Sequence, residues 1–453
     1  MDTLWELAKE VFSGELDLLF AAVALEWIDD AEIPPLVGAG VVRSDSRSSL
    51  SLRMEATNLT YGINWPWPRL KAGEEIPKEC FVRAVMKDHN GDIWNSSPFP
   101  LDINAIYILP QLRDGQPLSS FTRTTHVARN DDSSIRMILR KPPGLIFPRS
   151  TSFENKSLDG WSEWGFRRDH EVLTVLNAKL RVRALDEKWI EIRGSGNEPF
   201  GEAWVKSLSE ALAFVSSYRC DPPAFEIVSD GRNSLTLWHG PFDHFYTRLL
   251  GPAGFLDGRS TSAYWGYFAR LAEYLLKHPE NAEHLAVQFR LIREGSGSSL
   301  QTAGLTMAVA IESIAERLVP RSLGEPFPAD VMSAVRLAID SVKMAKRERE
   351  RVQGTLSSLD HVRVLDRLRG WAKLSNCPMS LITDWRHLRN DAAHGADLQG
   401  GPKSWERYMS SMELLYRLVG WAIDYSGPIV AASIPGYPPT EIGSPTATAA
   451  GRN

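Results

Sequence analysis

Short apolar runs interrupted by glycine, proline and asparagine dominate the first part of the chain. This pattern predicts strands near residues 49–56, 80–87, 135–139, 172–182 and 189–192. Turns are predicted at Asn90-Gly91-Asp92, at Asp114-Gly115 and over 141–144. We therefore interpret residues 1–200 as a β-rich N-terminal domain.

Tryptophan is abundant in this region, at Trp65, Trp67, Trp94, Trp161, Trp164 and Trp189. Exposed indole rings would offer stacking platforms for nucleic-acid bases. Aromatic side chains more often pack between strands, however, so we expect these residues in the core of a β-sandwich or barrel.

The hydrophobic pattern changes after about residue 200. A helix is predicted over 202–218, ended by Asp221-Pro222-Pro223, and a strand-like pair over 224–228 and 234–238. Residues 201–259 therefore form a mixed connecting region.

From residue 260 onward, apolar residues recur at helical spacing. Helices are predicted over 262–277, 280–293, 298–319, 328–353, 360–374, 379–395 and 402–425, with a short flexible connector at 295–299. The segment 426–453 is rich in Pro, Gly, Thr and Ala and is expected to be a flexible tail. The predicted fold class is α+β and multidomain, with a β-rich N-terminal region followed by an all-α region over 260–425.

Composition narrows the class of protein. The chain has 453 residues, of which 43% are hydrophobic and 24% charged, as in soluble multidomain proteins. A formal net charge of −5 excludes a polycationic nucleic-acid coat, so any RNA or DNA contact requires a local basic patch.

Compartment and membrane association follow from the cysteines and the apolar runs. Cys80, Cys220 and Cys377 lie far apart, which argues against a disulfide scaffold or a zinc site and fits a reducing cytoplasm. The start of the chain lacks the features of a signal peptide, and the best apolar run, 16–28, is too short to span a bilayer. We expect a cytoplasmic protein with no membrane partner.

The segment from Arg389 to His394 carries the candidate chemistry. On a helix, Leu381, Trp385, Leu388 and Ala392 share one narrow stripe, which is the predicted core face. Asn390 and His394 lie side by side roughly opposite this stripe, and Arg389 projects about 140° from His394. Arg389 and His394 therefore do not converge by helix geometry alone.

An arginine and a histidine together suit work on a phosphodiester. The guanidinium stabilises phosphate charge, and the imidazole moves a proton near neutral pH. Arg386 and His387 extend the same polar surface as candidate supporting residues. The bare spacing of Arg and His is common in proteins, so an ordinary polar helix face is the competing interpretation.

Trp385-Arg386-His387-Leu388 and the following Arg389-Asn390-Asp391-Ala392-Ala393-His394-Gly395 resemble the R-x4–6-H motif of HEPN domains, where a polar residue, often Asn, follows the arginine. The segment 306–316, with Glu312, is similar to the Ala- and Glu-bearing helix that packs beside the motif in Apea-like HEPN proteins. The resemblance covers about residues 260–425. Many HEPN toxins carry a tyrosine two residues after the histidine, whereas this chain has Gly395-Ala396.

This resemblance implies a metal-independent endoribonuclease of antiphage, abortive-infection or toxin type, with no cofactor. It assigns phosphate stabilisation to Arg389, general acid or base chemistry to His394, and orientation of the imidazole or phosphate binding to Asn390. Because the reaction needs both a base and an acid, and each chain supplies one motif histidine, we expect a homodimer formed through the helical region.

Two further sets of charged residues admit alternatives. The basic run Lys343, Lys346, Arg347, Arg349 and Arg351 could guide RNA, but mixed with Glu348 and Glu350 it is also typical of a solvated helix face. Glu312 and Glu316 are expected to pair with arginines of the motif helix rather than to act in catalysis. The histidines show no metal-ligand spacing, so no metal site is predicted.

Three functions remain open at this level. In the first, residues 1–200 sense an unidentified trigger, a ligand or a protein, and gate RNA cleavage by the helical region. In the second, the helical region is a non-catalytic HEPN-type adaptor that binds RNA, nucleotide or a partner. In the third, an enzyme lies in the N-terminal half and the helices only dimerise, although no nucleophile motif, ligand cluster or phosphate loop occurs there.

Overall fold

The structure is a computed structural model. It describes residues 3–29, 34–44, 50–57, 76–101, 116–118, 120–126, 133–145, 147–156, 162–197, 199–238, 261–324, 328–357, 362–393 and 401–442. The chain forms two compact units, and helix α3 (Glu202–Ser216) contributes to both. The first unit comprises Met1–Ser209 and Arg219–His244, and the second Glu210–Tyr218 and Phe245–Asn453.

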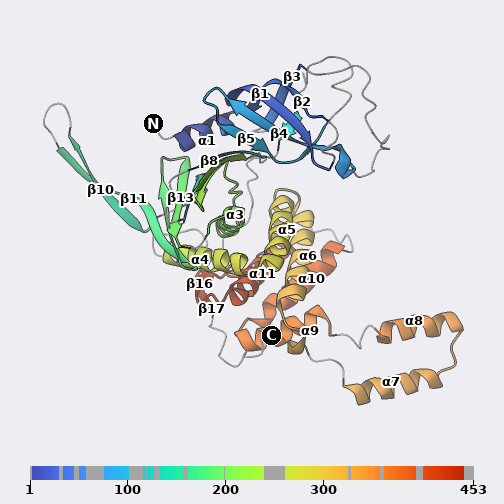
Figure 1. The fold of residues 1–453 in the computed structure, drawn as a ribbon. Coiled ribbons are helices and arrows are strands. Elements are labelled where there is room, and N and C mark those ends of the chain that lie inside the picture. Colours follow the sequence, from blue (N-terminus) through green and yellow to red (C-terminus); the bar gives the residue numbers. More distant parts are fainter. Residues whose placement is uncertain are drawn as a thin grey trace. The chain divides into compact units, whose positions relative to one another are not determined.

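A large antiparallel sheet makes up most of the first unit (Figure 1, blue to green). Its described strands are β1 (Asp17–Trp27), β2 (Leu36–Ser44), β3 (Leu50–Ala56), β4 (Phe81–Asp88), β5 (Ile93–Ser96), β6 (Phe99–Pro100), β7 (Gln116–Leu118), β8 (Ser120–His126), β9 (Ser133–Arg140), β10 (Arg149–Lys156), β11 (Ser162–Val175), β12 (Ala178–Ala184), β13 (Trp189–Gly196), β14 (Ala224–Ser229) and β15 (Arg232–Trp238). They run in the order β10-β11-β12-β13-β9-β14-β15-β8-β5-β4-β1-β2-β3-β7, and β6 pairs with β4. A short 3-10 helix, η1 (Lys78–Cys80), precedes β4.

One core of this unit lies between a face of the sheet and helix α1 (Thr3–Ser13), which packs against β2, β9, β14 and β15. Leu4, Ala8 and Val11 of α1 are buried at helical spacing. Trp94 and Trp189 are buried in this core, which confirms the packing interpretation for these two rings. Trp65, Trp67 and Trp161 lie outside the described residues, and the side chain of Trp164 is not described.

Two features of the sheet differ from the sequence prediction. The strand predicted over 172–182 is two strands, because β11 ends at Val175 and a tight turn at Leu176-Asn177 leads into β12. The pair β14–β15 is not a connector, since β14 pairs with β9 and β15 with β8. The β-rich unit therefore extends beyond residue 200 and includes this hairpin.

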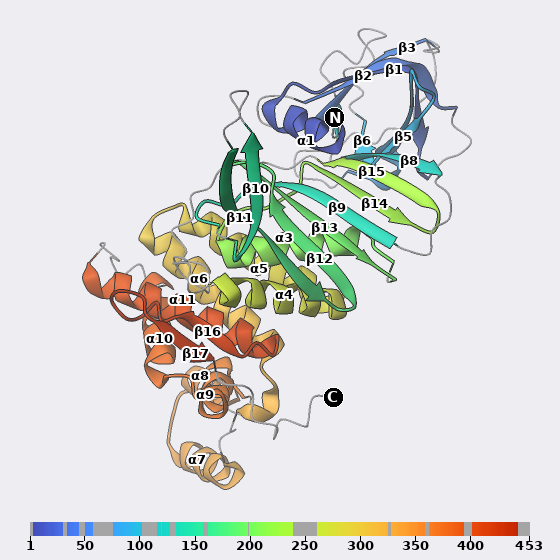
Figure 2. The ribbon, with the colours of Figure 1, turned by 90° about the vertical axis from the view of Figure 1, so that its left-hand side faces the viewer.

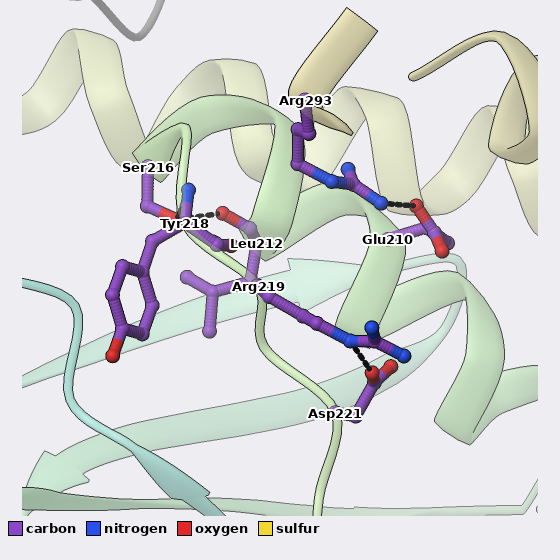
Figure 3. Close-up of polar contacts among 7 residues, drawn as sticks. All are labelled: Glu210, Leu212, Ser216, Tyr218, Arg219, Asp221 and Arg293. Carbon is purple, nitrogen blue, oxygen red and sulfur yellow. Dashed lines mark hydrogen bonds and ion pairs between the residues drawn. The ribbon is translucent and has the colours of Figure 1, made fainter. Parts of the chain in front are cut away.

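Helix α3 forms where the sequence predicts it. It ends at Ser216, whose Oγ donates a hydrogen bond to the Leu212 carbonyl oxygen at 2.6 Å and accepts one from Tyr218 N at 3.2 Å (Figure 3). Ser217 then adopts a left-handed conformation with φ of 53°, which stops the helix.

Helices make up most of the second unit (Figure 1, yellow to red). The described ones are α4 (Thr261–Lys277), α5 (Pro279–Ser296), α6 (Leu300–Leu318), the 3-10 helix η2 (Arg321–Leu323), α7 (Ala329–Ser341), α8 (Lys346–Ser357), α9 (Val364–Ser375), α10 (Met379–Ala393) and α11 (Pro402–Ala422). The prediction of a β-rich N-terminal half followed by a helical region is thus confirmed. Among the described residues, no helix is long and apolar enough to cross a membrane.

Helix α6 is central to the second unit, because it contacts α5, α9, α10 and α11. Ser299 caps its first turn by accepting a hydrogen bond from Thr302 N at 3.2 Å. The predicted connector at 295–299 is correspondingly shorter, since α5 continues to Ser296. The helix predicted over 328–353 is two helices, α7 and α8, separated by residues 342–345.

Residues 427–442 correct the prediction of a flexible tail from 426. They form the antiparallel pair β16 (Gly427–Val430) and β17 (Pro439–Ile442) beside α11. A buried ion pair within α11 holds them: Arg417 Nε donates to Glu413 Oε1 at 2.9 Å, and Ser433 Oγ donates to Glu413 Oε2 at 2.6 Å. Arg417 Nη2 also bonds Thr440 Oγ1 at 3.0 Å. Residues 443–453 lie outside the described residues.

Candidate functional site

Helix α10 buries the face that the sequence predicts. Leu381, Trp385, Leu388 and Ala392 are all buried, together with Ile382. Trp385 also donates a hydrogen bond from Nε1 to the Ala308 carbonyl oxygen of α6 at 3.0 Å. This buried bond matches the rotation of α10 that the apolar stripe dictates, with the polar side chains on the outer face.

The opposite face of α10 carries the candidate site. Arg386, His387, Arg389 and Asn390 are all exposed, as predicted. His394 follows the last residue of the helix and lies outside the described residues, so its distance from Arg389 stays a prediction. Gly395 and Ala396, where the sequence departs from the motif of many HEPN toxins, also lie outside the described residues.

Glu312 of α6 holds the guanidinium of Arg389 in a two-bond ion pair. Arg389 Nε donates to Glu312 Oε2 at 2.7 Å, and Nη2 donates to Oε1 at 3.0 Å. The two side chains are 44% and 31% exposed, so the pair adds little to stability but fixes the orientation of the planar guanidinium. The predicted pairing of Glu312 with the motif helix is confirmed.

Glu316 does not share this role among the described contacts. Its backbone oxygen accepts a hydrogen bond from Arg367 Nη2 of α9 at 2.7 Å. Arg367 also bonds the Val319 carbonyl oxygen and so caps the end of α6. Burial lowers the pKa of Arg367, as does the nearby Arg321, whereas Glu316 opposes this effect.

Asp391 is a contact of the motif segment that the sequence pattern does not reveal. Its carboxylate forms an ion pair with Arg407 Nη1 of α11. The partners are 16 residues apart on different helices, so no helical spacing signals them. With Arg389 tied to α6 and Asp391 tied to α11, the last turn of α10 is held from two neighbouring helices.

The basic run lies at and after the break between α7 and α8. Lys343 is exposed in the connection, and Lys346, Arg347 and Arg351 are exposed on α8. Arg349 Nη2 donates to the Val342 carbonyl oxygen at 3.4 Å. An RNA-guiding role and a solvated helix face both remain consistent with this exposure.

One cavity of the second unit lies beside Arg293. The cavity beside Arg293 has a volume of about 20 Å³, which is room for a single water molecule. Arg293 Nη2 donates to Glu210 Oε2 at 3.2 Å (Figure 3), while its Nη1 has no hydrogen-bond partner among the described residues. Figure 3 also shows the ion pair of Arg219 with Asp221 in the first unit. This cavity is too small for a substrate, so the exposed face of α10 is a better candidate site than this cavity.

The cysteines and acidic residues give no further chemical centre in the described chain. Burial raises the pKa of the Cys377 thiol to about 12, an effect that Arg417 opposes and Glu413 reinforces, so this thiol stays protonated. No three His, Cys, Asp or Glu side chains gather in a metal-binding arrangement within the ranges that the structure describes.

Comparison with models of known protein families finds no match for the chain, and comparison with curated proteins finds none either. The candidate site therefore has to be judged on its own residues and contacts.

Proposed function

We propose that this chain is a metal-independent endoribonuclease of HEPN type, with its active residues on α10 and with the β-rich unit as its regulator. By its resemblance to HEPN proteins, this enzyme would belong to the defence or toxin nucleases. An intracellular ribonuclease must be restrained until a trigger is present, and we assign this restraint to the β-rich unit. The proposal rests on the exposed Arg389, its contact with Glu312, and the sequence of the segment that ends at His394.

The two-bond ion pair with Glu312 is the observation that carries the proposal. A guanidinium has five N–H donors, and the pair uses one at Nε and one at Nη2. Both donors of Nη1 and the second donor of Nη2 are left over for a phosphate. A carboxylate that fixes a guanidinium on an exposed helix face is the arrangement expected for a group prepared to meet a phosphodiester.

The remaining chemistry follows from the residue types. In the proposed reaction a base removes the proton from a ribose 2′-hydroxyl, and the resulting oxygen attacks the adjacent phosphorus. The bond from phosphorus to the 5′-oxygen breaks, and an acid protonates that leaving oxygen. The products are a 2′,3′-cyclic phosphate and a 5′-hydroxyl. Arg389 stabilises the charge that builds on the phosphoryl oxygens, and His394 transfers the protons, with the exposed Asn390 beside it on the helix.

A dimer would supply the second motif histidine that one chain lacks. Base and acid are two groups, whereas each motif holds one histidine, and an ideal helix places Arg389 about 140° from His394. Two copies of the motif related by a two-fold axis would provide two histidines and two arginines in one groove. His387, which is exposed on the same helix, is the second proton carrier to test within one chain.

The deciding experiment is cleavage of RNA by the purified full chain in EDTA, with analysis of the product ends. Cyclic phosphate ends without metal are expected, and His394→Ala and Arg389→Ala are each expected to lower the rate by about 100-fold or more. Arg369→Ala is the matched arginine control. Arg369 is 45% exposed, lies on α9 rather than α10, and pairs with Asp366 of the same helix. His278→Ala, 46% exposed, is the matched histidine control. A strict need for metal, or equal rates in all variants, would contradict the proposal.

A non-catalytic adaptor is the second candidate, because an exposed ion pair between α10 and α6 is also an ordinary contact between packed helices. An adaptor would bind RNA, nucleotide or a protein partner without cleaving it. Binding of RNA by wild-type protein with no cleavage under any trigger would select this function.

A further inference from the structure

Three adjacent strands of the first unit carry arginines in direct register. Arg181 of β12 lies opposite Arg193 of β13, and Arg193 lies opposite Arg136 of β9. Opposed side chains of an antiparallel pair lie on the same face with Cβ atoms about 5 Å apart. The three strands lie side by side in Figure 2, so the row spans roughly 10 Å.

The row belongs to a larger basic surface, which we call the arginine face. Arg183 on β12 and Lys179 on the same strand point to the same side as Arg181, because alternate residues of a strand share a face. The arginine face thus comprises Arg136, Lys179, Arg181, Arg183 and Arg193. Lys179, Arg181 and Arg193 are exposed.

Two of these five cations have partners. Glu191, whose side chain is 3% exposed, accepts from Arg136 Nε at 2.5 Å and from Arg183 Nε at 2.6 Å. Glu226 lies opposite Arg136 on β14, but its carboxylate accepts from Asn233 Nδ2 at 2.7 Å. No described residue forms an ion pair with Arg181 or Arg193, so their charges face solvent.

Like charges placed directly opposite one another destabilise a sheet. The register of Arg181 with Arg193 therefore indicates a surface arranged to meet negative charge rather than to stabilise the fold.

We infer that the arginine face binds the phosphate backbone of RNA. Guanidinium groups match phosphate geometry with two donors each, and a row of them across strands suits a repeating anion. Of the described strand positions beside these arginines, Ser134, Val172, Thr174 and Ser195 have no aromatic ring, and His170, opposite Arg183, is bonded through Nδ1 to Asp169 at 2.9 Å. Binding through phosphates alone is independent of base sequence. This inference concerns the first unit and does not depend on catalysis by α10.

The test is fluorescence anisotropy with the full chain and a labelled 2′-O-methyl oligouridylate, which lacks the hydroxyl needed for cleavage. Titrations at several KCl concentrations give both the Kd and its salt dependence. The variant Arg181→Gln/Arg193→Gln is expected to raise the Kd by about tenfold or more and to make the log–log salt slope shallower by about 1.4, the value for two lost phosphate contacts.

Two matched variants test whether binding depends on the arginine face itself or only on the total positive charge of the protein. Arg53→Gln/Arg83→Gln removes two exposed arginines from β3 and β4 of the same sheet and should bind like wild type. Arg181→Lys/Arg193→Lys keeps the charge and should retain most of the binding. The glutamine variant should unfold thermally no earlier than wild type, because it removes a like-charge contact, so its weaker binding would not reflect misfolding.

Several outcomes would overturn the inference. Wild-type Kd and salt slope in the glutamine variant would show that the arginine face does not bind RNA. A wild-type chain that binds phosphatidylglycerol vesicles or a poly-glutamate peptide, but not the oligouridylate, would assign the face to another partner. Loss of RNA cleavage with intact oligouridylate binding would leave this inference standing and affect only the proposal for α10.

Discussion

At the scale of single residues, the contact of Arg389 with Glu312 positions the guanidinium group but contributes little to the stability of the fold. An exposed ion pair contributes about 0–1 kcal/mol to folding, so the stability of the protein does not require this pair. What the pair does fix is the direction of the guanidinium plane. Its removal should therefore alter kinetics more than unfolding.

Replacing the carboxylate tests this role. In the Glu312→Gln variant no carboxylate offsets the charge of the Arg389 guanidinium, and the amide oxygen can accept only one of the two present hydrogen bonds, so the guanidinium plane is held less firmly. We expect KM for RNA to fall because attraction for phosphate grows, and kcat to fall by about tenfold to 100-fold because the group is misplaced. Steady-state cleavage kinetics give both values. Asp366→Asn, which removes the partner of Arg369 on α9, is the control and should change neither. An unchanged kcat in Glu312→Gln would reject the positioning role.

Residue-level prediction succeeded where one helix alone decides the outcome. The spacing of Leu381, Trp385, Leu388 and Ala392 identifies the buried face of α10, because the helical period is independent of the rest of the fold. The pair of Asp391 with Arg407 depends on how α11 packs beside α10, and one sequence carries no signal for that.

At the scale of elements, close packing of η2 against α9 requires a glycine. A Cβ atom on Gly370 would lie 1.7 Å from the Leu323 carbonyl oxygen, which is backbone and cannot rotate away. The α9 backbone therefore approaches η2 more closely than any side chain would allow. Arg367, one turn earlier on α9, caps α6 from the same junction.

The Gly370→Ala variant should be destabilised by about 1–3 kcal/mol, because the overlap outweighs the higher helix propensity of alanine. Urea unfolding followed by circular dichroism measures the difference. Gly354→Ala on α8 is the matched control, since nothing lies within 4 Å of the added methyl group, and its stability should be unchanged or higher. Equal behaviour of the two variants would mean that η2 moves aside at no cost.

Two element boundaries escaped prediction for identifiable reasons. Glu348 Oε2 accepts from the backbone N of Ala345 at 3.1 Å, as the third residue of a capped helix does, but the cap position holds alanine instead of serine or threonine. The turn at Leu176-Asn177 contains no glycine, although Leu176 takes a φ of 51°. In both cases the backbone adopts a turn whose usual residues are missing.

At the scale of the whole molecule, the proposed site should need two chains. When wild-type protein is mixed with an excess of Arg389→Ala, exchange of subunits places most wild-type chains in mixed dimers. Cleavage activity per wild-type chain should then fall toward zero as the excess grows. Dilution with Arg369→Ala should leave it unchanged. Constant activity at every ratio would mean that one chain carries a complete site.

The C-terminal strands decide how the chain can be shortened or tagged. Because Glu413 is 2% exposed and receives two of its hydrogen bonds from Ser433, cutting the chain after α11 would leave a buried carboxylate short of donors, at about 1–3 kcal/mol for each lost partner. Arg417 would lose Thr440 in the same cut. Residues 427–442 thus supply hydrogen-bond partners that the buried side chains of α11 need. A purification tag should therefore be placed after Ile442.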